Sequence, residues 1–103
     1  MLVQQQVNGY NAHDIEAFLA PYADSVAIYD LSGKLLSKGK GAMRKDYGFI
    51  KLPGLHCRLL NRIVQDNTVV DHEEITVGSM KPRYGIAIYK TEKGKITRVY
   101  FGD

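Results

Sequence analysis

The 103-residue sequence contains no tryptophan, only three prolines and a single cysteine, Cys57. A lone cysteine excludes an internal disulfide and favours a reduced setting. No apolar run approaches the roughly 18 residues of a transmembrane helix, so we expect no membrane partner. The first residues also lack the basic and apolar regions of a secretory signal, and we therefore expect a cytoplasmic localisation.

The net charge is a modest +3, with 45% hydrophobic and 24% charged residues, which is typical of one folded domain over residues 1–103. Basic residues gather in one segment, at Lys34, Lys38, Lys40, Arg44, Lys45 and Lys51. No aromatic platform accompanies them, so we interpret the segment as a solvated surface and expect no nucleic-acid partner.

Apolar residues at helical spacing mark the first half of the chain. We expect a first helix with one apolar face at Val3, Val7 and Tyr10. A second helix is expected to be capped by Asn11 and to end or kink at Pro21. Its predicted buried stripe is Ile15, Phe18, Leu19 and Tyr22. The apolar residues of a predicted third helix are Met43, Tyr47 and Ile50.

Strand-like segments dominate the rest of the sequence. A first strand over 25–31 returns through a turn to 35–38, and β-branched residues then recur in four further segments. Those segments are 55–65, 68–77, 83–91 and 95–101. Helices early and hairpins late predict an α+β fold with helices on one face of an antiparallel sheet.

A two-residue loop at Asp66-Asn67 predicts the register of the long hairpin. In this register Arg62 lies opposite Asp71, and Leu59 lies opposite Glu74. One face then comprises Cys57, Leu59, Asn61, Ile63, Val70, His72, Glu74 and Thr76. We expect it to meet the helices. The opposite face, expected to meet a partner subunit, includes Leu60, Val64, Val69, Ile75 and Val77.

Several short motifs follow one another in an order known from one superfamily. Residues 11–24 match its N-A-x-D … Y/F-A-D-D stretch, and Tyr29-Asp30 matches its E-D at the end of the first strand. Residues 41–47 match its G-x-x-A-I-R-x-F-Y helix, and 89–99 match its closing hairpin. The chain resembles the nuclear transport factor 2-like superfamily, specifically the SnoaL-like and ketosteroid-isomerase-like branch.

The resemblance implies a cone-shaped fold in which three helices and a strongly curved antiparallel or mixed sheet enclose an apolar pocket, usually in a homodimer. It implies that Asp30 is a general base acting next to a carbonyl, and that Tyr47 supports the hydrogen bonds of the pocket. The two groups that stabilise the enolate in the isomerases are replaced here by Gln6 and Ala87.

Asp30 is the first candidate for catalysis. By strand alternation it shares a face with Val26 and Ile28, which places it at the inner end of the first strand. Burial there would raise the pKa of the carboxyl and make it a usable base. The alternative is an Asx turn, in which the Asp30 carboxylate only opens the turn at Ser32 and Gly33.

The polar trio Asn61, His72 and Glu74 gives the other candidates, because polar groups on a covered face need partners or a pocket. His72 and Glu74 can act as an acid/base or ligand-orienting pair, with Asp30 holding His72, or can be a structural pair. Asn61 and Tyr47 can orient a ligand carbonyl or hydroxyl, or satisfy their neighbours. No metal-ligand spacing is present, and we expect neither a metal nor another cofactor.

Three functions fit these residues. The first is a SnoaL-like isomerase, cyclase or dehydratase-type lyase in which a pocket aspartate shuttles protons on a small apolar carbonyl compound. The second is a domain that binds a small apolar molecule without turning it over. The third is an interaction domain that forms a homodimer through the outer face of the sheet.

Overall fold

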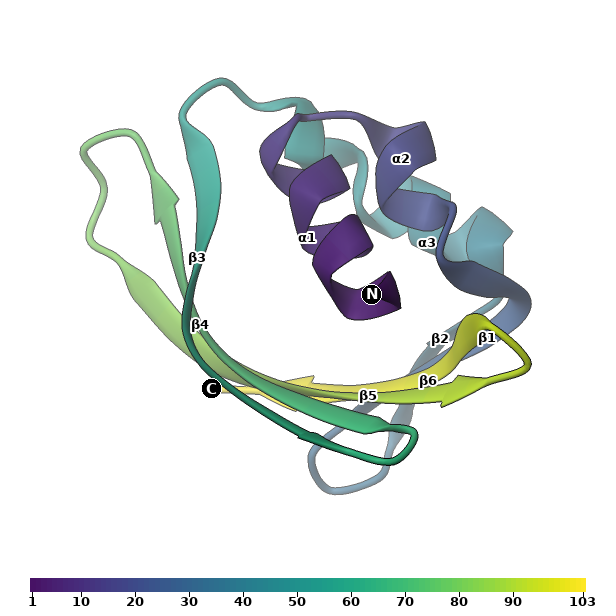
Figure 1. Cartoon of the computed structure of the whole chain (residues 1–103). Coiled ribbons are helices and arrows are strands. Elements are labelled where there is room, and N and C mark those ends of the chain that lie inside the picture. The colour runs from purple at the N-terminus through teal and green to yellow at the C-terminus, as the bar shows by residue number, and fades with distance from the viewer.

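A curved sheet of six strands packs against three helices in the computed structural model, which describes residues 1–103 (Figure 1). The helices are α1 (Leu2–Asn11), α2 (Ile15–Leu19) and α3 (Lys40–Asp46), followed by the short 3-10 helix η1 (Gly48–Lys51). No helix is long and apolar enough to span a membrane. The strands are β1 (Tyr22–Asp30), β2 (Leu35–Lys38), β3 (Leu55–Gln65), β4 (Thr68–Val77), β5 (Arg83–Glu92) and β6 (Lys95–Gly102).

The strand order is β2-β1-β6-β5-β4-β3, with β1 and β6 parallel and all other neighbours antiparallel. The sheet curls toward the helices without closing, so the helices lie across its concave side (Figure 1). This arrangement confirms the predicted α+β fold with a curved mixed sheet.

The junction of the first two helices differs from the expected one. Asp14, not Asn11, caps α2, because its Oδ1 accepts hydrogen bonds from the backbone N–H groups of Glu16 and Ala17 at 3.1 Å. Asn11 ends α1 and pairs with the edge strand instead. Its amide donates to the Cys57 carbonyl at 2.9 Å and accepts from the Cys57 N–H at 2.7 Å. Asn11 therefore fixes α1 against β3.

The second helix is also shorter than expected, because the chain enters β1 directly after Pro21. Tyr22 is therefore the first residue of a strand and not the end of a helical stripe. Its side chain is nevertheless buried, in the same core cluster as Phe18 and Leu19.

The long hairpin follows the predicted register only near its turn. Arg62 pairs with Asp71 and Asn61 with His72, but Leu59 pairs with Glu73 and not with Glu74. The register shifts between Leu59 and Asn61, where β3 contains one extra residue. A β-bulge of this kind exchanges the two faces of the bulged strand along its length.

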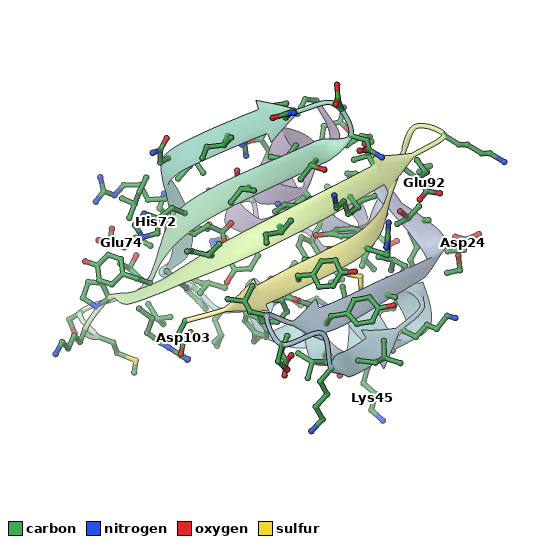
Figure 2. All side chains as sticks on the ribbon, turned by 90° about the horizontal axis from the view of Figure 1, so that it is seen from below. Asp24, Lys45, His72, Glu74, Glu92 and Asp103 are labelled. Carbon is green, nitrogen blue, oxygen red and sulfur yellow. The ribbon has the colours of Figure 1, made fainter.

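The expected assignment of the β4 faces is therefore wrong. The side covered by the helices includes Asp71, which is fully buried, and Val69, which is 4% exposed. Glu73 on the same side lines the cavity described below. His72 and Glu74 project from the opposite, convex side, as the view of that side in Figure 2 shows. Side chains along β4 do alternate between the two sides of the sheet, as expected. The sequence pattern did not show which of these two sides the helices cover.

Candidate functional site

A cavity of about 280 Å³ lies between the helices and the concave side of the sheet. Of the 21 residues that line it, 15 are hydrophobic, including Val7, Phe18, Ile28 and Val99. Helices α1 and α2 and strands β1, β3, β4, β5 and β6 all contribute lining residues. The cavity is largely apolar, and its charged lining residues are Glu73, Arg83 and Asp103. A mostly apolar wall with a small number of polar groups is typical of sites for small molecules.

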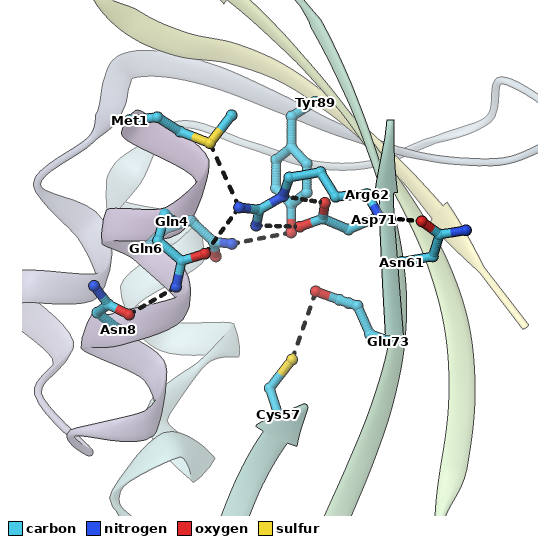
Figure 3. A network of polar contacts seen from close by, with 10 residues as sticks. All are labelled: Met1, Gln4, Gln6, Asn8, Cys57, Asn61, Arg62, Asp71, Glu73 and Tyr89. Carbon is cyan, nitrogen blue, oxygen red and sulfur yellow. Dashed lines mark hydrogen bonds and ion pairs between the residues drawn. The ribbon is translucent and has the colours of Figure 1, made fainter. Parts of the chain in front are cut away.

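Glu73 is the only carboxylate side chain that β4 contributes to this cavity. It points from the sheet into the space beside α1, where Cys57 of β3 lies next to it (Figure 3). The Cys57 thiol donates to Glu73 Oε2, with Sγ and Oε2 3.6 Å apart. No group of the chain donates to Oε1, so this oxygen is available to a bound molecule.

The pKa of Glu73 is raised to about 7, chiefly because burial removes water from the carboxylate. The negative charge of Asp71 raises it as well, whereas the Cys57 hydrogen bond and the Arg62 charge lower it. A carboxyl group with this pKa is present in both protonation states near neutral pH. It can therefore accept a proton and return it without a large energetic cost in either direction.

A buried ion pair lies beside Glu73 on the same face of the sheet. Arg62 donates to both carboxylate oxygens of Asp71, over distances of 2.6 and 2.8 Å (Figure 3). Arg62 also donates to Gln4 of α1 at 2.8 Å, which joins the helix to the hairpin. The guanidinium compensates the Asp71 charge, whereas Glu73 forms no ion pair with a basic side chain.

Five tyrosines line the cavity. The Tyr84 hydroxyl donates to Glu74, and the other four are Tyr10, Tyr22, Tyr47 and Tyr89. Burial is the main cause that raises the pKa of each of these four hydroxyls, and the Glu73 charge contributes to all four shifts. These hydroxyls remain protonated at neutral pH and can act as neutral hydrogen-bond donors. Gln6 connects two of them, since Tyr22 donates to its Oε1 at 3.0 Å and its Nε2 donates to Tyr89 at 3.2 Å.

Asp30 lies outside the cavity lining, at the end of β1. Its Oδ1 accepts hydrogen bonds from the Ser32 N–H at 2.9 Å, the Ser32 hydroxyl at 2.6 Å and the Lys34 N–H at 3.0 Å. The Ser32 hydroxyl is the largest cause that lowers the pKa of Asp30. The expected rise in pKa is therefore wrong, because the hydrogen bonds of the turn outweigh the effect of burial on the carboxylate.

The polar trio lies on the convex side of the sheet and not in the cavity. His72 and Asn61 are exposed and face each other across the β3–β4 ladder. Glu74 accepts hydrogen bonds from Arg58 and Tyr84, each at 3.0 Å. The structure therefore does not bring His72 and Glu74 together with Asp30.

Tyr47 is the one predicted site residue that lines the cavity. It follows α3 and packs against Phe18 and Phe49, with ring centroids 5.0 and 5.6 Å away. Burial raises its pKa to about 12. Gln6 and Ala87 also line the cavity.

Glu73 and the role of Gln6 were missed from the sequence. The signal for Glu73 was present, because it alternates with Val69, Asp71, Ile75 and Val77 on one face of a strand that is largely aliphatic. The face with Cys57, Leu59, Ile63 and Val70 has fewer charged residues, and the sequence pattern therefore favours it as the covered face. The bulge in β3 is not visible in that pattern. No three His, Cys, Asp or Glu side chains are grouped closely enough to hold a metal ion.

Solved structures with the same architecture share little sequence with this chain. A cystatin-fold protein from Novosphingobium aromaticivorans has a TM-score of 0.88 and 22% identity, covering 99% of this chain and 95% of its own. A SnoaL-like protein from Burkholderia thailandensis has a TM-score of 0.79 and 17% identity, covering 97% and 89%. TerC, crystallised with polyporic acid, has a TM-score of 0.77 and 18% identity, covering 98% and 87%. No curated protein matches the sequence.

A curved, unclosed sheet that folds around a cavity beneath three helices defines a protein of the cystatin-like, nuclear transport factor 2-like class. The sequence model of the SnoaL-like domain matches residues 3–99. The chain belongs to the SnoaL-like domain family, as the motifs indicated.

Proposed function

We propose that this SnoaL-like chain is an enzyme that moves a proton on a small, neutral, apolar carbonyl compound, with Glu73 as the proton shuttle. The position of Glu73 supports this most directly, because it is a desolvated carboxylate at an apolar cavity with one free oxygen. The shuttle is therefore assigned to Glu73 in place of Asp30, whose carboxylate is occupied by the turn.

The proton transfer needs only the carboxylate and a substrate with an acidic C–H next to its carbonyl. Glu73 takes the proton, the C–H electron pair forms a carbon–carbon double bond, and the carbonyl π pair moves to oxygen as an enolate. The protonated Glu73 then returns the proton, either to the same carbon or to another carbon of the conjugated system. The first outcome is hydrogen exchange, and the second is isomerisation.

The surroundings of Glu73 favour a neutral substrate. A second anion in the cavity would face the Glu73 charge in a medium of low dielectric constant, and a cation would be desolvated among mostly apolar side chains. An apolar molecule gains free energy there from burial, roughly 25 cal/mol for each Å² removed from water. The similarity in fold to TerC, crystallised with polyporic acid, is consistent with a small organic ligand.

The test uses 2-acetylnaphthalene, a neutral ketone whose methyl protons are next to the carbonyl. In D₂O, proton NMR measures how fast the wild-type chain replaces these protons by deuterium. We expect saturable exchange above the rate in buffer, and a loss of about 100-fold or more in Glu73→Gln. Glu74→Gln is the matched control, since it makes the same change one residue along on the convex side of the sheet.

Three results would overturn the proposal. Full exchange activity in Glu73→Gln would exclude Glu73 as the base. Loss of exchange in Asp30→Asn, with Glu73→Gln unaffected, would restore the assignment made from the sequence. Saturable binding of the ketone without any exchange in the wild type would instead identify a domain that binds ligands without turning them over.

The expected homodimer remains a proposal, now with different residues. We propose that two copies pair through the convex side, where Ile63 and Ile86 are 62% and 42% exposed. Val69, Ile75 and Val77 are not available for this contact, because they face the helices. Sedimentation should give a dimer at micromolar concentration and a monomer for Ile63→Lys, and a wild-type monomer would contradict the proposal.

A further inference from the structure

We infer that the Tyr89 hydroxyl is the donor that stabilises the enolate oxygen, and that Gln6 and Tyr22 position it for this task. The inference rests on the proposed function of Glu73. It replaces, with a tyrosine on β5, the two donors whose positions are taken here by Gln6 and Ala87. Tyr89 touches the reacting atoms in this account, whereas Gln6 and Tyr22 act only through it.

The three side chains form one directed hydrogen-bond chain. The Tyr22 hydroxyl donates to Gln6 Oε1 at 3.0 Å, which turns the Gln6 amide nitrogen toward Tyr89, 3.2 Å away. Gln6 donates to the Tyr89 oxygen, so the Tyr89 hydroxyl keeps its own proton for another acceptor. No atom of the chain accepts that proton, and Tyr89 lines the cavity. A carbonyl oxygen bound in the cavity is the acceptor that would complete the chain.

Burial fixes this arrangement before any ligand enters. Gln6, Tyr22 and Tyr89 are 4%, 3% and 5% exposed, although a glutamine is seldom buried so completely. The Gln6 amide nitrogen donates to Tyr89 and the Gln6 amide oxygen accepts from Tyr22, so both polar atoms of this side chain have a suitable partner. A donor held in place before the reaction stabilises developing charge without reorganising, and the bond from Gln6 polarises the Tyr89 O–H further.

The other hydroxyls of the cavity are less suited to this role. The Tyr22 hydroxyl donates its hydrogen bond to Gln6, and the Tyr84 hydroxyl donates its own to Glu74. Tyr10 and Tyr47 are only partly buried, and no hydrogen bond from the chain fixes their hydroxyl oxygens. The anionic neighbours of Tyr89 are Asp71 and Glu73. Arg62 neutralises Asp71, and Glu73 is itself neutral once it has taken the substrate proton. When the enolate forms, no uncompensated negative charge therefore lies beside Tyr89 to repel it.

The test uses 2-acetylnaphthalene labelled with ¹³C at its carbonyl carbon. Hydrogen-bond donation to the bound ketone should move the ¹³C resonance downfield in the wild type. We expect Tyr89→Phe to lose this shift and to slow deuterium exchange about 100-fold. Gln6→Leu should reduce both effects less, because it removes the positioning contact but leaves the hydroxyl. Tyr100→Phe is the matched control, since Tyr100 stacks on Tyr29 away from the cavity.

The two readouts separate this inference from the proposed function. Glu73→Gln should abolish exchange but leave the downfield carbonyl shift in place. If Glu73→Gln abolishes exchange while Tyr89→Phe changes neither readout, the shuttle stands and the Tyr89 inference is overturned. If the wild type shows the shift and Tyr89→Phe loses it, but the wild type itself exchanges no protons above the rate in buffer, the donor stands and the shuttle fails. A wild-type chain that does not bind the ketone at all overturns both.

Discussion

The thiol of Cys57 donates a hydrogen bond to Glu73 from the neighbouring strand, with Sγ and Oε2 3.6 Å apart. This contact exists because the extra residue in β3 brings Leu59 opposite Glu73 and turns Cys57 toward the helices. The carboxylate is thereby held between a donor that stabilises its charge and a burial that opposes it. The balance of these two effects sets the pKa of Glu73 and therefore its protonation state.

Removal of the thiol should shift this balance. In Cys57→Ala the hydrogen bond that lowers the pKa of Glu73 is lost, so the pKa should rise above its value of about 7. NMR titration of the ¹³C-labelled Glu73 side-chain carboxyl measures this directly. Cys57→Ser keeps a donor at the same position and should hold the pKa at or below the wild-type value. A fall of the pKa in Cys57→Ala would contradict the assigned contact.

Glu73 should lower the stability of the fold at neutral pH. Its folded pKa of about 7 lies above the ordinary 4.5, so between these values the folded chain retains a proton that the unfolded chain has lost. The unfolding free energy of the wild type therefore falls as pH rises across this window. Glu73→Gln lacks the titrating carboxyl and does not show this fall. We expect the difference in unfolding free energy between Glu73→Gln and the wild type to grow as pH rises to about 7. It should reach on the order of 3 kcal/mol in favour of the variant and stay constant above that pH.

Urea unfolding at a series of pH values checks this, with Glu74→Gln for comparison. The pKa of Glu74 is lowered, first by its hydrogen bond with Arg58, so its contribution has the opposite sign. Glu74 stabilises the fold above its ordinary pKa and loses that contribution as pH falls. A stability difference between Glu73→Gln and the wild type that does not change with pH would show that Glu73 is not desolvated.

The ion pair of Arg62 and Asp71 should cost most when only one partner is removed. Arg62→Met leaves the fully buried Asp71 carboxylate without its cation, at a cost of about 3–5 kcal/mol. The double variant Arg62→Met/Asp71→Leu removes both charges and should recover much of that loss. Urea unfolding of the singles and the double gives the coupling free energy. Strictly additive losses would contradict a coupled pair.

Gly9 should be indispensable for the approach of α1 to α2. A Cβ on Gly9 would lie 2.3 Å from the Phe18 backbone nitrogen, and this neighbour cannot move aside as a flexible side chain could. We expect Gly9→Ala to lose at least about 1–3 kcal/mol of stability. The control is Gly41→Ala in α3, where a Cβ meets nothing within 4 Å and helix propensity should add up to about 1 kcal/mol. Thermal unfolding that ranks the two variants equally would contradict this packing.

Much of the fold followed from local patterns. The strands around Asp66-Asn67 have the bounds expected from the sequence, because a tight turn and β-branched alternation are local signals. The helices were predicted less well, since the cap at Asp14 competes with an equally plausible one at Asn11. Asn11 was instead used for a contact with Cys57, 46 residues away, which no local pattern encodes.

The site was predicted poorly for a different reason. The bulge at Leu60 and the choice of which sheet face meets the helices are tertiary features, and both decide where Glu73 and Glu74 point. Asp30 matched the family motif in sequence, but Ser32 and Lys34 directly after it supply donors that bind its carboxylate locally. Tyr47 lines the cavity, although α3 ends at Asp46 and so excludes Tyr47 and Ile50 from the expected third helix. The predicted role of Tyr47 toward a ligand stays a prediction.

The pH dependence of the exchange rate tests the central role of Glu73 most directly. Deuterium exchange of bound 2-acetylnaphthalene is measured by proton NMR across the neutral range, for the wild type and Glu73→Gln. The wild-type rate should rise with pH as Glu73 loses its proton, with a midpoint at about 7, and reach a plateau above it. Glu73→Gln should show a low rate without this midpoint. A wild-type profile retained in Glu73→Gln would contradict the account.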